Sequence, residues 1–389
     1  MPAQKLLLIS EIFPPAVGGS GRWLSELYAR VGVSRLVITD SLPTEFWGYQ
    51  DPDYVERLPM VLPDTGALSV RGGLGYFRLA RRVRSSLQGS VITRAQAARV
   101  VPEGWLLLML KKIWAINDFE VFAHGEEVNL DSASDGGVMS SRQHRWMARL
   151  VFKNCSRVIA NSRNTAKILS DQWRIPECKI VVLNPAIDTT VYKPAEDIGS
   201  IKSKLDWQDN FVVLTVGRLQ KRKGHDAVIA AVQRLRRTIP GFKYVIAGSG
   251  EEYGQLSRLV KEMNLQDVVQ FERDLTDSEL IEHYQACDVF VLANRQVGAD
   301  IEGFGIVLLE AAACGKPTIT GRSGGTGEAI EDGVTGFTID ATDPEVIAET
   351  IERLHQSPST MLRLSQAGRI RAEEQFDWSN VVKSFTLAR

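Results

Sequence analysis

The sequence predicts a protein of the α/β class with two domains, each built on a parallel sheet. The chain has 389 residues, which is more than a single hydrophobic core usually holds, so two domains are expected. Short runs rich in valine, isoleucine and leucine alternate with helical stretches, which is the pattern of β-α-β units. The alternation occurs in two series. The segment between them contains Pro185, Pro194 and Gly199, which are typical of a linker.

The two series define the expected elements. In the first we expect strands at residues 6–10, 36–39, 91–93, 120–123 and 157–160, and helices at 20–31, 74–86, 103–113, 144–154 and 163–172. In the second we expect strands at 211–216, 243–247, 268–271, 289–292 and 318–320. With the linker at 184–206, this predicts two Rossmann-like domains, residues 1–190 and 191–375, that face each other across a cleft.

Composition excludes several classes of protein. The net charge of −1 gives no overall attraction to nucleic acid. The apolar runs are shorter than the ~18 residues that suggest a membrane span, and the run at residues 6–9 predicts a first strand rather than a signal peptide. The four cysteines form no Cys-x-x-Cys pair, which indicates buried thiols in a reducing compartment rather than disulfides or a zinc site. We therefore expect a cytoplasmic protein.

Glu302 and Glu310 are the most informative pair in the chain. They stand at the two ends of Glu-Gly-Phe-Gly-Ile-Val-Leu-Leu-Glu, in which an apolar helical run begins near Gly305. Gly303 and Gly305 let backbone amides approach a ligand closely, and the helix would direct its positive N-terminal end at an anion. The carboxylates then lie on either side of the anion site. This arrangement suits a nucleotide sugar, in which a diphosphate joins two parts rich in hydroxyl groups.

A basic loop follows the first strand of the second series. It reads Gly-Arg-Leu-Gln-Lys-Arg-Lys-Gly and puts Arg218 and Lys223 at the carboxyl edge of a strand, where open α/β sheets bind ligands. Both side chains could bind phosphate oxygens and stabilise a departing nucleoside diphosphate. Taken alone, the loop is better explained as a solvated surface loop or a nucleic-acid patch. The downstream glutamate pair favours the phosphate interpretation.

Three further elements have two explanations each. The loop after the first strand contains Gly18 and Gly19 ahead of a helix, which suits a phosphate or an ordinary tight turn. His124 ends the strand at 120–123, where an imidazole can turn into a cleft, but a lone histidine is more often structural. The glycine-rich stretch at 321–329 offers additional amides or a flexible loop.

Together these elements resemble the retaining glycosyltransferases of family four (GT4), which have the GT-B fold. The stretch Glu-Gly-Phe-Gly-Ile-Val-Leu-Leu-Glu-Ala-Ala-Ala-Cys-Gly-Lys-Pro carries the resemblance most specifically, and the similarity extends over essentially the whole chain. The resemblance implies that Arg218 and Lys223 bind the donor diphosphate and that Glu310 binds the ribose. Glu302 would bind the transferred sugar together with the amides of Gly303, Phe304, Gly305 and Ile306.

The resemblance also assigns roles to the first domain. Gly18 and Gly19 would lie near the donor phosphates, and His124 would contact the donor sugar at the reacting centre. Glu126 would belong to the same His-Gly-x-Glu element or shape its loop. Residues 376–389 would form a last helix that crosses back onto the first domain. No Asp-x-Asp element stands where a divalent ion would hold the diphosphate, so we expect no metal and no cofactor.

The resemblance is strongest to bacterial GDP-mannose-dependent α-mannosyltransferases, including those that act on phosphatidylinositol mannosides. It implies mannosyl transfer from GDP-mannose to a hydroxyl group of a lipid or glycan acceptor. Transfer from UDP-glucose or UDP-N-acetylglucosamine stays open, because the residues that contact the base are not identifiable. A nucleotide-sugar epimerase of the same fold and a non-catalytic binding module also stay open.

A basic stretch in the first series contains Arg78, Arg81, Arg82 and Arg84. It suits contact with anionic lipid or a solvated helix face. The apolar stretch at residues 105–114 is better explained as a buried helix. Because family members with lipid acceptors often dock on membranes with such a stretch, we expect peripheral contact with the cytoplasmic face of a membrane.

Overall fold

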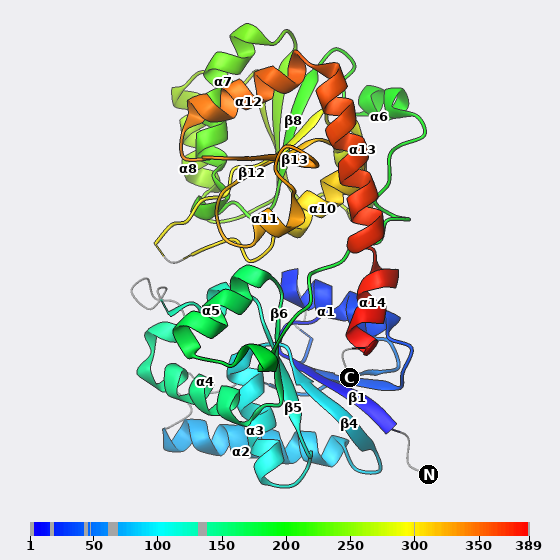
Figure 1. Ribbon diagram of the computed structural model, residues 1–389, viewed down its shortest axis with the longest axis vertical. Coiled ribbons are helices and arrows are strands. Elements are labelled where there is room, and N and C mark those ends of the chain that lie inside the picture. Colours follow the sequence, from blue (N-terminus) through cyan, green and yellow to red (C-terminus); the bar gives the residue numbers. More distant parts are fainter. Residues whose placement is uncertain are drawn as a thin grey trace. The chain divides into compact units, whose positions relative to one another are not determined.

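The computed structural model describes residues 4–15, 19–42, 46, 48–60, 69–130, 138–298 and 300–387. The chain divides into two compact units (Figure 1). The first comprises Met1–Asn184 with Val382–Arg389, and the second comprises Pro185–Val381. Each unit contains a parallel sheet with helices, which confirms the predicted α/β class.

The sheet of the first unit has seven strands within the described residues, in the order β3-β2-β1-β4-β5-β6-β7. The strands are β1 (Gln4–Ser10), β2 (Arg35–Thr39), β3 (Val55–Arg57), β4 (Val91–Ala97), β5 (Phe119–Ala123), β6 (Arg157–Ala160) and β7 (Ile180–Val182). The helices are α1 (Gly19–Arg30), α2 (Val70–Ser86), α3 (Trp105–Lys112), α4 (Arg142–Asn154) and α5 (Arg163–Trp173). The strand order reverses between β1 and β4, which gives this sheet the switch point of a Rossmann-like domain.

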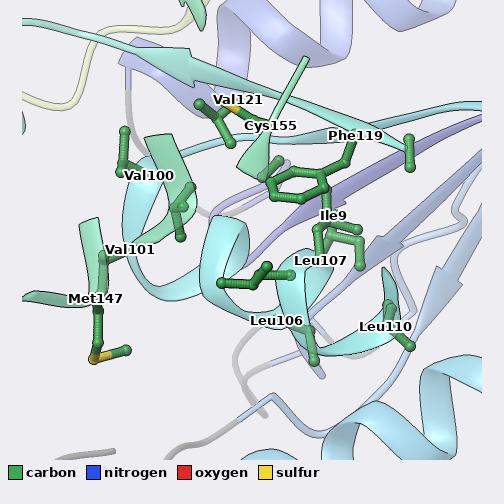
Figure 2. Packing of buried hydrophobic residues seen from close by; sticks show 14 of the residues in the cluster. Ile9, Val100, Val101, Leu106, Leu107, Leu110, Phe119, Val121, Met147 and Cys155 are labelled. Atoms are coloured by element: carbon green, nitrogen blue, oxygen red, sulfur yellow. The ribbon is translucent and has the colours of Figure 1, made fainter. Parts of the chain in front are cut away.

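Alternate residues of the central strands face different layers of helices, because successive side chains of a strand point to opposite faces. Val121 of β5 lies in a buried cluster with residues of α2, α3 and α4, part of which Figure 2 shows. The next residue, Phe122, instead packs edge-on against Trp23 of α1, with 5.6 Å between the ring centroids. The sheet is therefore covered on both faces, as parallel sheets usually are.

The second unit repeats this topology. Its described residues form six parallel strands in the order β10-β9-β8-β11-β12-β13, with the reversal between β8 and β11. The strands are β8 (Phe211–Val216), β9 (Phe242–Ala247), β10 (Val269–Glu272), β11 (Val289–Leu292), β12 (Thr318–Gly321) and β13 (Gly336–Ile339). The helices are α6 (Ile198–Lys204), α7 (His225–Thr238), α8 (Tyr253–Glu262), α9 (Asp277–Ala286), α10 (Ile306–Ala313), α11 (Thr326–Ala329), α12 (Pro344–His355) and α13 (Pro358–Gln375). Helix α14 (Trp378–Leu387) begins in this unit, and its residues from Val382 on belong to the first unit.

Strand β8 shows why the second sheet was visible in the sequence. Val213 lies in a cluster with residues of α7, α8 and α12, whereas Leu214 lies in a cluster with residues of α9, α10 and α13. A strand that is buried on both faces reads as a continuous apolar run rather than an alternating one. The positions that follow such strands are therefore readable from the sequence as candidate ligand sites.

The structure confirms every predicted strand and adds three. Strands β3, β7 and β13 were not predicted; each lies at an edge of its sheet, and β3 and β7 have only three residues. The predicted linker at 184–206 was too long, because α6 occupies Ile198–Lys204 and is capped by Asp197. The helix predicted at 103–113 begins at Trp105, after a wide turn at Val100–Gly104.

Candidate active site

The candidate site of the second unit lies at the switch point of its sheet. The basic loop follows β8 and continues into α7, and residues 293–302 follow β11. The two segments are joined by a hydrogen bond from the Arg295 amide to the Arg222 carbonyl, 2.8 Å. Gly217 has a φ of 147°, and its carbonyl oxygen lies 2.1 Å from the position of a Cβ on Gly248. Only glycine permits this approach, which packs the first turn of the loop closely against the end of β9.

Glu302 is held by two cations at this edge. Its Oε2 atom lies 2.6 Å from Lys223 Nζ and 2.5 Å from Arg222 Nη1. Burial by itself would raise the pKa of the Glu302 carboxyl, but the charges of Lys223 and Arg222 outweigh this and lower that pKa. The site therefore keeps a buried carboxylate ionised, and a carboxylate in that state accepts hydrogen bonds from hydroxyl groups.

The two predicted phosphate-binding residues differ in their surroundings. Lys223 is buried, and its ammonium lies against Gly217 at the end of β8. Arg218 is exposed, and within the described residues its guanidinium forms no ion pair. The structure thus brings Lys223 to Glu302 but leaves Arg218 in solvent. Arg222, which the sequence analysis did not single out, occupies the position beside Glu302.

The segment from Gly303 to Ile306 leads into α10 as predicted. Gly305 has a φ of 82° and caps the helix, and a Cβ there would lie 3.1 Å from Leu308 and Thr326. Phe304 is buried and packs against Phe376, with 5.8 Å between the ring centroids. Its side chain therefore belongs to the core, and only its backbone is free for a ligand. The amides of this turn remain the groups suited to an anion.

The glycine-rich loop after β12 packs against the backbone carbonyl of Glu302. The Gly325 amide donates a 2.9 Å hydrogen bond to the Glu302 carbonyl. A Cβ on Gly324, which has a φ of 67°, would lie 1.9 Å from the same oxygen. Asn294 holds this loop in place, because its Nδ2 donates to the Ser323 carbonyl at 2.8 Å. The stretch at 321–329 is therefore packed directly against the candidate site.

Glu310 lies inside α10 and is buried. The hydroxyl of Tyr284, a residue of α9, donates a 2.7 Å hydrogen bond to Glu310 Oε2. Burial and the charge of Glu310 raise the pKa of Tyr284 well above its ordinary value, so this hydroxyl stays a donor. The carboxyl of Glu310 is thus fixed by a neighbouring helix.

In the first unit, His124 is a neutral, oriented imidazole. Burial, with the nearby charge of Arg99, lowers the pKa of His124 to about 4, although the hydrogen bond to Ala98 acts against this. Its Nε2 lies 2.8 Å from the Ala98 carbonyl oxygen, which requires the proton on Nε2 and leaves Nδ1 as an acceptor. The ring also packs edge-on against Trp23, with 5.6 Å between centroids.

Two details of the first unit differ from the sequence analysis. Glu126 is exposed, and it is Glu127 that is partly buried beside His124, where burial raises the pKa of the Glu127 carboxyl to about 8. Gly18 lies outside the described residues, and a Cβ on Gly19 would have no neighbour within 4 Å. A Cβ on Gly21 would lie 2.7 Å from the Ile12 carbonyl oxygen, so the loop needs its glycine there.

The described part of the chain contains neither a cluster of metal ligands nor a membrane-spanning helix. Among these residues, no group of histidine, cysteine, aspartate and glutamate side chains is placed to hold a metal ion. None of the helices described is both long and apolar enough to cross a membrane.

The paired Rossmann-like units and the charged groups at the switch point of the second are those of a glycosyltransferase. The family model "Glycosyl transferases group 1" matches residues 197–371, and "Glycosyltransferase Family 4" matches residues 24–191. A relative that covers 88% of the chain is 30% identical to it. The chain belongs to the group 1, family 4 glycosyltransferases.

Two of the curated relatives cover most of the chain, and a third covers 60% of it. The "GDP-mannose-dependent alpha-(1-6)-phosphatidylinositol monomannoside mannosyltransferase" of Mycolicibacterium smegmatis is 30% identical over an alignment of 368 positions, which covers 88% of this chain and 94% of the relative. The protein of the same description from Mycobacterium tuberculosis is 25% identical over 97% of this chain and 96% of its own. The "D-inositol 3-phosphate glycosyltransferase" of Thermobifida fusca is 30% identical over 60% of this chain and 54% of its own.

Solved structures of the GT-B fold resemble the chain along its length. Anabaena HepE in complex with UDP has a TM-score of 0.79 at 19% identity, with 99% of each chain covered. Sucrose-phosphate synthase from Thermosynechococcus elongatus has a TM-score of 0.81 at 18% identity, with coverage of 99% of this chain and 98% of the other. At these identities the similarity concerns the fold, which is the predicted GT-B fold.

Proposed function

We propose that this protein transfers a mannosyl group from GDP-mannose to a hydroxyl group of a lipid or glycan acceptor, with retention of configuration and without a metal ion. The observation that carries the proposal is Glu302, a buried carboxylate kept ionised by Lys223 and Arg222 at the switch point of the second sheet. The choice of mannose and GDP is supported by the descriptions of the mycobacterial relatives.

The donor would be bound by the groups around this edge. Lys223 and the exposed Arg218 supply positive charge for the diphosphate, together with the amides at the start of α10. Glu302 would accept hydrogen bonds from hydroxyl groups of the sugar, and Glu310 from those of the ribose. Both carboxylates are held by neighbouring side chains, so little ordering is needed when the donor binds.

Catalysis would rest on stabilising the leaving group. As the bond between the anomeric carbon and the diphosphate oxygen breaks, negative charge develops on that oxygen next to Lys223 and Arg218. The acceptor hydroxyl would form the new bond from the same face, which retains the configuration, and its proton would pass to the departing phosphate oxygen. Lys223 and Arg218 would take the electrostatic role that a divalent cation takes in metal-dependent transferases.

His124 would contribute an acceptor rather than a proton. Its Nε2–H is used by the Ala98 carbonyl, and its pKa of about 4 keeps the ring neutral near pH 7. Nδ1 is then suited to accept a hydrogen bond from a donor-sugar hydroxyl at the reacting centre. Gly18 and Gly19 would lie near the donor phosphates, as the family resemblance implies.

A direct test is product analysis with labelled GDP-mannose, a lipid extract as acceptor, and a chelator present. We expect a new α-linked mannoside and free GDP. A β-linkage would contradict retention, and activity only with added metal would contradict metal independence. If transfer occurs only from UDP-glucose or UDP-N-acetylglucosamine, the donor is that nucleotide sugar and not GDP-mannose. An altered free nucleotide sugar would indicate an epimerase, and binding without turnover a non-catalytic module.

Peripheral membrane contact is the second part of the proposal. Helix α2 exposes an apolar stripe of Val70, Leu74 and Phe77, whose side chains are 81%, 50% and 47% exposed. These positions share one side of a helix by their spacing. The helix has no acidic residue, and five arginines are exposed on it: Arg71, Arg78, Arg81, Arg82 and Arg84. An apolar stripe among cations suits the surface of an anionic membrane, and the four free cysteines suit its cytoplasmic face.

Sedimentation with lipid vesicles tests this surface. We expect binding to vesicles that contain phosphatidylglycerol, weak binding to pure phosphatidylcholine, and release by salt. Replacing Arg78, Arg81 and Arg82 by glutamine should abolish binding to the phosphatidylglycerol vesicles. The matched control replaces three exposed basic residues of other helices, Arg163, Lys167 and Arg237. Equal loss in both variants, or no binding by the wild type at low salt, would contradict the assignment.

A further inference from the structure

Arg222 is surrounded by acceptors that belong to the protein itself. Its Nη2 donates to Gln220 Oε1 at 3.1 Å, its Nε lies 3.0 Å from Asp300 Oδ1, and its Nη1 lies 2.5 Å from Glu302 Oε2. Its side chain is 13% exposed. A planar guanidinium fixed at three points has little freedom to turn toward a ligand. Arg222 is therefore held as part of the site wall.

Lys223 is the opposite case. The Lys223 ammonium contacts Glu302 through one oxygen, Oε2, which Arg222 also contacts. A lysine is a point charge on a flexible stem, so it can turn from one anion to another. The ammonium lies beside Gly217 at the carboxyl end of β8, where a phosphate would approach.

The second carboxylate oxygen of Glu302, Oε1, keeps its capacity to accept hydrogen bonds. Both cations contact Oε2, and among the described residues none donates a hydrogen bond to Oε1. Without ligand, the charges of Arg222 and Lys223 are balanced by those of Glu302 and Asp300. A bound diphosphate adds negative charge. Of the two cations, Lys223 rather than Arg222 can turn toward the diphosphate, because the Arg222 guanidinium is held by three acceptors.

We propose that Arg222 is a positioning residue for the transferred sugar: it holds the Glu302 carboxylate in place when Lys223 leaves it for the donor diphosphate. This inference rests on the proposed function, since it takes the ligand to be a sugar linked to a nucleoside diphosphate. Arg222 keeps Glu302 ionised and directs Oε1 at the sugar hydroxyls. It does not bind the phosphates.

A double-mutant cycle tests whether Arg222 acts through Glu302. We expect Arg222→Met to lower kcat/KM for GDP-mannose on the order of 10-fold to 100-fold, the range for losing a hydrogen bond to a charged group. In a Glu302→Gln background the same change should have little further effect. The affinity for GDP, which lacks the sugar, should fall much less than kcat/KM. Equal losses in both backgrounds, or an equal loss of GDP affinity, would overturn the proposal.

The pH profile gives a readout that general structural damage would not produce. Removing one of the two cations raises the pKa of Glu302, so the acid limb of kcat/KM should move to higher pH in Arg222→Met. Arg222→Lys restores the positive charge, so its acid limb of kcat/KM should lie close to that of the wild type. Arg295→Met is the matched control, because Arg295 is paired with Asp226 at 2.7 Å and is not in contact with Glu302. An unmoved limb in Arg222→Met contradicts the inference.

The two proposals fail separately. If the wild type uses another donor, the proposed sugar is wrong, and the same cycle on that donor tests Arg222. If the wild type has no turnover, NMR titration of carboxyl-labelled protein, with Glu302→Gln to assign the signal, tests the ionisation directly. The Glu302 signal should titrate at higher pH in Arg222→Met than in wild type, and identical titration would overturn the positioning role.

Discussion

The Tyr284 hydroxyl donates a 2.7 Å hydrogen bond to Glu310 in the interior of the second unit, between α9 and α10. Tyr284 is fully buried, and its ring also packs against Phe290 of β11, with 5.6 Å between the centroids. The carboxylate proposed to bind the ribose is therefore oriented by a side chain that is itself locked by the core.

Removing that hydroxyl should affect both folding and the donor site. We expect Tyr284→Phe to lower the free energy of unfolding by about 1–3 kcal/mol, because a buried carboxyl loses a hydrogen-bond partner. Affinity for GDP should fall several-fold, since Glu310 is no longer fixed. Urea denaturation and calorimetric titration measure the two effects. Unchanged GDP affinity in a destabilised variant would separate Glu310 from the ribose site.

Lys223 and Arg218 should differ in their effect on stability. Lys223→Met leaves the buried Glu302 with one cation fewer, so both stability and GDP affinity should decrease. Arg218→Met removes an exposed side chain, so GDP affinity should decrease while the melting temperature stays within about 1 °C of wild type. Titration with GDP and thermal denaturation of both variants provide the check. Wild-type GDP affinity in Arg218→Met would remove it from the phosphate site.

Gly324 should be intolerant of a side chain. Its φ is 67°, and a Cβ would lie 1.9 Å from the Glu302 carbonyl oxygen, so Gly324→Ala must displace the backbone of Glu302. We expect loss of GDP-mannose turnover with only moderate loss of stability. Gly327→Ala is the control, because a Cβ there has no neighbour within 4 Å. If the two variants had equal activity, the support of Glu302 by this loop would be refuted.

Two histidines, His124 (partly buried) and His225 (buried), should make stability depend on pH. Burial lowers the pKa of His124 and of His225 to about 4. The unfolded chain binds these protons near pH 6.5 and the folded protein does not, so stability is lost as the pH falls from about 6.5 to about 4. The slope of the unfolding free energy against pH is proportional to the number of protons taken up on unfolding. We expect His124→Asn and His225→Asn each to reduce that number by about one in this pH window. Denaturation at several pH values measures the slope, and an unchanged slope would mean that the ring is already charged in the folded protein.

The sequence predicted most of the fold because the strands of both sheets are buried on two faces. Runs such as Phe211–Val216 are apolar throughout, and the groups that follow them were visible as candidate site residues. Strand β3 was missed because it is a three-residue edge strand, Val-Glu-Arg, with one apolar side chain. Strand β7 is also a three-residue edge strand, but its sequence Ile-Val-Val is apolar, so the signal was present and was not used.

The site was only partly predictable for a different reason. Arg222 and Lys223 are neighbours in a short 3₁₀ turn at Lys221–Lys223, and only the geometry of that turn shows that both side chains reach Glu302. Residue type and spacing favoured Arg218, which the structure leaves in solvent. Likewise, Glu126 and Glu127 are equivalent in the sequence, and burial alone distinguishes them.

The pairing of Lys223 with Glu302 would affect how well inorganic phosphate competes with a nucleotide sugar for the site. A free inorganic phosphate offers Lys223 a new partner but offers Glu302 nothing, so its binding would strand a buried carboxylate with one cation fewer. A nucleotide sugar supplies both a phosphate and hydroxyl groups, and so compensates both partners at once. In the proposed donor site, this ion pair would therefore favour a nucleotide sugar over simple phosphates.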